Sequence, residues 1–138
     1  MSKSTTTDND FLKYTFNKTA ISWDSNTTLY VALHTADPTA SGTQTTNEAN
    51  YAGYSRVAVS RSSSEWAVAS NSVSNVNAIQ FPARTDAGTQ NITHVSIGTA
   101  ASGAGQVLYF GSLTSGTYPV TIGVSPKFLT GKLVVTET

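Results

Sequence analysis

The sequence predicts an all-β fold, a two-sheet β-sandwich of jelly-roll-like or immunoglobulin-like type, preceded by an extended N-terminal arm and one short helix. Three observations support this class. Short segments alternate apolar with polar residues, and turns rich in Gly, Ser, Thr and Asn separate them. The 18 Ser and 22 Thr are typical of a solvated sheet surface. Only 12% of the residues are charged, about half the usual share for a soluble domain.

Composition also excludes several classes of function. Eight basic and eight acidic residues balance, which argues against a partner such as nucleic acid or an anionic membrane, because both require clustered Lys and Arg. The absence of cysteine excludes disulfides, thiolate metal sites and a cysteine nucleophile. No apolar run approaches the roughly 20 residues that a membrane-spanning helix needs. We expect no metal and no cofactor.

The N-terminal region changes character near residue 10. Residues 1–10 are almost entirely polar and predict an arm that is ordered only by contact with a partner. We therefore expect that deleting them leaves a folded protein. A helix is predicted over residues 9–18, because Asp8 or Asn9 can cap its start and the apolar Leu12 and Phe16 are one turn apart. Residues 11–138 are then a single domain.

From residue 28 onward the hydrophobic period is two. A long loop over residues 36–53 opens with the turn-forming pair Asp37-Pro38, and loops of this length are usually functional. Pro119 has no amide hydrogen, so its strand should lie at an edge or begin at a bulge. Strands are predicted over residues 28–34, 54–60, 65–69, 76–81, 93–99, 106–113, 118–124 and 132–136.

Catalytic patterns are absent from the sequence. His34 could act as a general base oriented by Asp37, but a strand-end histidine bonded to a loop backbone is the favoured interpretation. His94 lies on a polar strand face, and Ser96 stands where a second metal ligand would be needed. The glycine-rich stretch 98–105 lacks the G-K-[ST] ending of a phosphate loop. The sequence therefore predicts a binding protein rather than an enzyme.

Candidate interface residues belong to two groups. The first is the hydroxyl-rich part of the arm. The second consists of Tyr and Arg side chains, which are enriched in binding hot spots because they bury a large area while keeping polar ends satisfied. The alternative for the second group is packing over the protein's own core. The predicted interface residues are Ser4, Thr5, Thr6, Thr7, Tyr51, Tyr54, Arg56 and Tyr109.

Taken in order, several segments of the chain resemble a family of small virion proteins of tailed bacteriophages, labelled tail-fibre-like, and the capsid decoration proteins of phages are similar in size and composition. The resemblance implies a virion protein made in the host cytoplasm. The segments that carry it are Asn9–Leu12 with Phe16, Leu29–Pro38, Thr46–Glu48, Tyr51–Val57, Phe81-Pro82, Leu108–Leu113 and Ile122–Phe128.

We therefore expect a capsid decoration (cement) protein that stabilises the assembled shell by binding it. Its expected partners are the major capsid protein or another virion protein, and further copies of itself in a dimer or trimer. One alternative is a tail or tail-fibre component, such as an adaptor or ring protein. Another is a receptor- or carbohydrate-binding module, in which Trp23 could be an exposed platform for a sugar ring.

Overall fold

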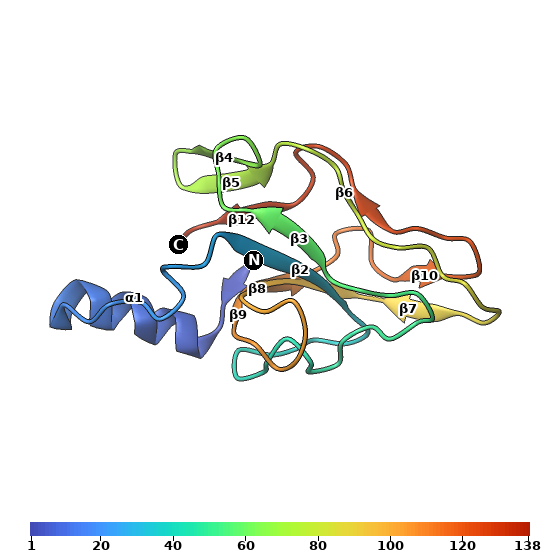
Figure 1. Ribbon diagram of the computed structural model, residues 1–138, viewed down its shortest axis with the longest axis horizontal. Coiled ribbons are helices and arrows are strands. Elements are labelled where there is room, and N and C mark those ends of the chain that lie inside the picture. Colours follow the sequence, from blue (N-terminus) through green and yellow to red (C-terminus); the bar gives the residue numbers. More distant parts are fainter.

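The computed structural model describes residues 1–138 and confirms the all-β sandwich with a single helix (Figure 1). All paired strands are antiparallel. The elements in chain order are β1 (Ser2–Lys3), α1 (Thr5–Asn17), β2 (Thr28–His34), β3 (Val57–Ser60), β4 (Trp66–Ala69), β5 (Ser72–Asn75), β6 (Ile79–Gln80), β7 (Gln90–Ile92), β8 (His94–Gly98), β9 (Val107–Ser112), β10 (Tyr118–Val120), β11 (Lys127–Phe128) and β12 (Val134–Thr136).

The larger layer is a five-stranded sheet with the order β1-β9-β8-β2-β3. Its central strands, β2 and β8, pair from Tyr30 opposite Gly98 to His34 opposite His94. Alternation along these strands directs Val31, Leu33 and Val95 into the core, as the period of two predicts.

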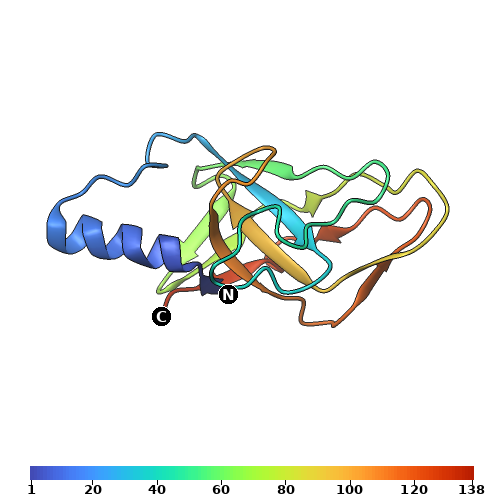
Figure 2. The same ribbon diagram turned by 90° about the horizontal axis from the view of Figure 1, so that it is seen from below.

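Three small sheets, β10-β7, β11-β6 and β12-β5-β4, form the other layer. Each of them contributes to the same core cluster of 13 buried residues as the large sheet, for example through Ile92, Ile79 and Val135. The small sheets therefore cover one face of the large sheet (Figures 1 and 2).

Some predicted strands are shorter than expected. The segment 118–124 is a strand only to Val120, after which Gly123 adopts a φ of 78° and turns the chain. Ile122, which the alternation places inside, is consequently 63% exposed. Pro119 lies on an edge strand, as predicted, because β10 pairs only with β7.

The predicted extended arm over residues 1–10 is wrong in this structure. Ser2 and Lys3 pair with Phe110 and Tyr109 at the edge of the large sheet, and the helix begins at Thr5 rather than at residue 9. The reason is the cap: the Ser4 hydroxyl accepts a hydrogen bond from the Thr7 amide at 3.2 Å. Residues 1–10 are therefore part of the folded domain.

Helix α1 extends beyond the sheets and is attached mainly through its first two turns (Figures 1 and 2). Thr7 is completely buried, with its hydroxyl 3.1 Å from the Val107 carbonyl, and Phe11 meets Trp23 edge to face at 6.1 Å. Leu12 and Phe16 are on the opposite side and are 55% and 78% exposed. The apolar pair that suggested the helix thus faces away from the body.

Candidate interaction surface

A largely buried polar network is built around Arg56 and Glu48. The Arg56 side chain is 3% exposed and binds Glu48 through two nitrogens, at 2.7 and 2.8 Å. The Tyr54 hydroxyl donates to Glu48 at 2.8 Å and accepts from the Leu33 amide at 3.2 Å. Burial raises the pKa of Tyr54 far above its usual value, so this phenol remains a neutral donor.

Arg56 also connects two segments that are distant in sequence. Its Nη1 donates to the carbonyl of Ala100 at 2.8 Å, and Nη2, which also binds Glu48, donates to the carbonyl of Gly103 at 2.6 Å; both carbonyls belong to the β8–β9 connection. Glu48 belongs to the long loop after β2. The guanidinium therefore fixes the long loop and the hairpin together, using the several donors that only arginine offers.

Most of the predicted interface side chains are used inside the protein. Tyr51 is 5% exposed and donates to the Pro82 carbonyl at 2.6 Å. Ser4 is buried, like Thr7. The alternative of internal packing therefore describes Tyr51, Tyr54 and Arg56, whose polar groups have partners within the chain. The hydroxyls of Ser4 and Thr7 are likewise bonded within the chain.

The other three predicted interface residues differ in accessibility. Thr5 and Thr6 are exposed on the first turn of α1. Tyr109 is half-buried, and its hydroxyl donates to Glu137 at 2.7 Å. Glu137 also pairs with Lys3, so this cluster joins the two ends of the chain. An interface role for Thr5 and Thr6 stays a prediction.

His34 has the structural role that the sequence favours. Its Nδ1 lies 2.9 Å from the Thr46 carbonyl, and its Nε2 lies 2.7 Å from the Ser96 hydroxyl. A neutral imidazole satisfies both contacts by donating to the carbonyl and accepting from the hydroxyl. His34 and Ser96 are both 0% exposed, so no substrate reaches this pair. Burial lowers the pKa of His34, which favours the neutral form.

The long loop after β2 covers the outer face of the large sheet, which the sequence predicts to be solvated. Gln44 of this loop is 0% exposed and lies against Gly98 and Gly105. A Cβ atom at Gly98 would come within 2.3 Å of the Gln44 side chain, so only glycine fits there. This packing explains why the Gly98 side of β8 is buried.

Trp23 is not a free platform for a sugar ring. Phe11 contacts it edge to face, the Arg61 guanidinium lies 5.5 Å from its ring centre, and its indole N–H donates to Asp10 at 3.1 Å. The half-buried indole is thus part of the attachment of α1. The argument for a carbohydrate site at this residue is therefore lost.

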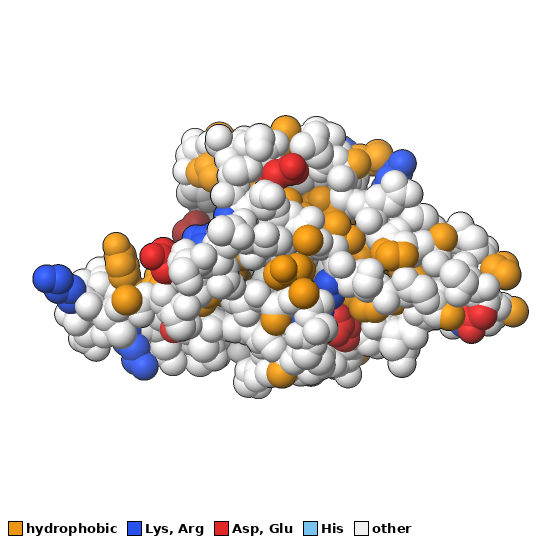
Figure 3. Space-filling view, viewed as in Figure 1, with side chains coloured by type: hydrophobic (Ala, Val, Ile, Leu, Met, Phe, Trp, Pro, Cys, Tyr) orange, Lys and Arg blue, Asp and Glu red, His pale blue; other side chains and the backbone are white.

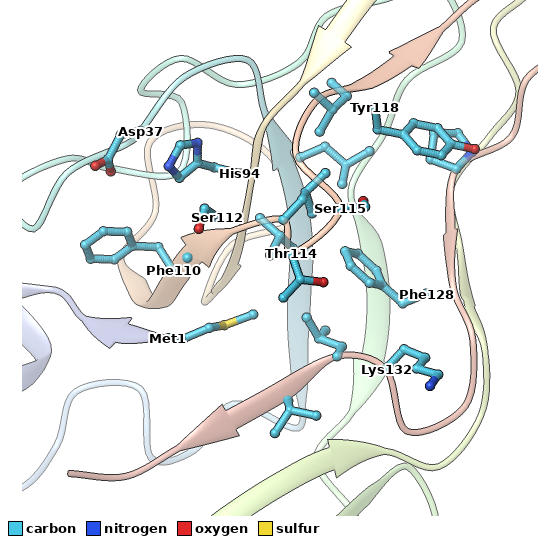
Figure 4. A pocket seen from close by; sticks show the side chains of 18 of the residues that line it. Met1, Asp37, His94, Phe110, Ser112, Thr114, Ser115, Tyr118, Phe128 and Lys132 are labelled. Carbon is cyan, nitrogen blue, oxygen red and sulfur yellow. The ribbon is translucent and has the colours of Figure 1, made fainter.

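A groove of about 880 Å³ lies between the end of β9 and the segment that carries β11 and β12 (Figure 4). The buried core side chains of Leu33, Val95 and Leu133 line it. Phe110 and Phe128 stand at its sides. Hydroxyl groups of Ser112, Thr114 and Ser115 line its rim. Asp37 and His94 lie toward one end, and Lys132 lies toward the other.

Two further observations concern metals and membranes. No group of three or more His, Cys, Asp or Glu side chains is placed to hold a metal ion. Helix α1 is too short and too polar to cross a lipid bilayer.

The protein is a small all-β body with a helix that projects from one end (Figure 3). The chain belongs to the family described as "Podophage GP4 fiber I protein gp80", which it matches over residues 2–136. It is thus a phage virion structural protein, as the resemblance of its sequence segments implies. No curated protein matches the chain.

Proposed function

We propose that this chain is a component of a virion fibre, which acts by adhering to other virion proteins and to further copies of itself, without catalysis. The main support for this proposal is the match to a fibre family over residues 2–136. The description of that family supports the tail-fibre alternative over the decoration of a capsid shell.

The structure supports adhesion through its rigidity. The Arg56–Glu48 pair and the hydrogen bond between His34 and the Thr46 carbonyl hold the long loop against the sheet, so little reordering is needed on binding. Two accessible apolar features are the outer side of α1 and the groove beside β9. A preformed body with two such features is suited to repeated contacts in an assembly.

Labelling of the particle tests the proposal. Antibodies against the purified chain, carrying gold, should mark fibres in electron micrographs, and gel densitometry should give few copies per virion. Antibodies against the major capsid protein serve as the control, because they should mark the shell. Gold spread over the shell, with hundreds of copies per particle, would instead identify a decoration protein.

A further inference from the structure

The outward side of α1 and the groove beside β9 both lack a partner within the chain. We propose that each is the partner of the other in neighbouring copies, so that α1 of one molecule docks into the groove of the next. The inference rests on the proposed fibre function, because a fibre needs a contact that repeats from copy to copy. Such a head-to-tail contact builds rings or open filaments.

The outward side of α1 is formed by Leu12 and Phe16. They are one turn apart and 55% and 78% exposed, while Thr7 and Phe11 on the other side attach the helix to the body. The fold does not need the outward pair for its own core. Two neighbouring apolar side chains on a projecting helix are the anchors that a groove recognises.

The groove offers a matching surface. Its volume of about 880 Å³ accommodates two such side chains together with part of the helix that bears them. The buried side chains of Leu33, Val95 and Leu133 give it an apolar lining. Phe110 and Phe128 add aromatic rings at its sides. A copy cannot fill its own groove with its own helix, because Thr7 fixes the first turns to β9 and α1 points away from the body.

Charge complementarity selects a second copy and sets its direction. The groove has Asp37 toward one end and Lys132 toward the other (Figure 4). Helix α1 carries the basic Lys18 at its C-cap and Asp8 in its first turn, where the Asp8 carboxylate is half-exposed and lies 3.7 Å from Lys3 of the same chain. A helix whose C-terminal end points toward Asp37 brings Lys18 to that carboxylate and Asp8 to Lys132. The reverse direction would place Lys18 beside Lys132 and Asp8 beside Asp37, which are pairs of like charge.

The contact is expected to be weak when it is made once. A Phe side chain buries about 150–250 Å² when it is enclosed. Two anchors of this kind are well below the roughly 1,000 Å² of a stable interface. Repetition along a fibre then raises the overall strength through avidity.

Sedimentation velocity over a concentration series measures this association. We expect the average mass of the wild-type chain to rise with concentration. The average masses of the two single variants Leu12→Asp and Phe16→Asp should stay at the monomer value. Tyr14→Asp is the matched control, because Tyr14 is 61% exposed on the same helix but outside the Leu12–Phe16 side. Lys132→Glu should weaken association, and adding Asp8→Lys should restore it.

Disulfide trapping detects the contact directly, since the chain contains no cysteine. Mixing Asn9→Cys with Ser115→Cys and oxidising should give a heterodimer, because Asn9 flanks the Leu12 side and Ser115 lines the groove. Asn9→Cys mixed with Ser64→Cys, an exposed site outside the groove, should not. A wild-type chain that stays monomeric and gives no trapped dimer overturns the proposal and leaves another virion protein as the occupant, whereas gold labelling tests the fibre assignment independently.

Discussion

Replacing Arg56 by Met tests whether the network at the long loop is essential for stability. The substitution keeps a long apolar side chain but leaves Glu48, whose side chain is 15% exposed, without its cation, and the carbonyls of Ala100 and Gly103 without their donor. Breaking a buried pair from one side costs about 3–5 kcal/mol. For a domain of this size we expect the melting temperature to fall by about 10 °C or more.

Urea unfolding followed by circular dichroism measures the change, and Glu48→Leu combined with Arg56→Met is the informative partner. Removing both charges leaves no uncompensated ion, so the double variant should recover a large part of the loss. Lys127→Met, at an exposed position, is the control for the loss of a positive charge alone. A cost below about 1 kcal/mol for Arg56→Met, as for an exposed ion pair, would refute the reasoning.

Three further predictions concern the loop, the sheet and the N-terminus. Burial lowers the pKa of His34 below its usual 6.5, so the unfolded chain binds the proton more readily than the folded chain. The contribution of His34 to stability should be full above pH 6.5 and should be lost as the pH drops through the folded-state pKa. Urea unfolding should therefore give a lower free energy of unfolding at pH 5 than at pH 7, and this difference should be smaller in His34→Gln. Gly98→Ala should cost about 1–3 kcal/mol through its clash with Gln44, and thermal melts should show the cost shrinking in a Gln44→Ala background. Deleting residues 1–10 should destabilise the protein rather than leave it intact, because Ser4 and Thr7 are buried; Ser4→Ala alone should cost about 1 kcal/mol, and equal melting temperatures for the deletion and the full chain would contradict this.

Strongly patterned segments are the part of the fold that could be predicted. The strand Thr28–His34 has the same bounds in the sequence prediction and in the structure. A short run of apolar and β-branched residues that ends at a turn favours a buried strand over other secondary structure. Strand β5, Ser72–Asn75, is polar and carries no such signal. It is a strand because β4 and β12 pair with it on both sides, and β12 lies far away in sequence.

The candidate site was predictable in residue type but not in role. Tyr54 and Arg56 were recognisable as side chains suited to a contact, yet the groups that Arg56 contacts at Ala100 and Gly103 lie 44 and 47 residues away. Periodicity contains no information on such pairings. The groove was likewise not predictable, because it is formed by β9, β11 and β12 only after the layers have packed.

The joined ends of the chain have a mechanical consequence. Lys3 and Tyr109 both bind Glu137, and β1 pairs with β9 through two residues only. A pulling force applied between the two termini would act on these contacts before it acted on the core, and it would separate β1 from the sheet edge. A copy under tension would therefore lengthen first at β1 and the C-terminal residues, while the β-sandwich stayed folded.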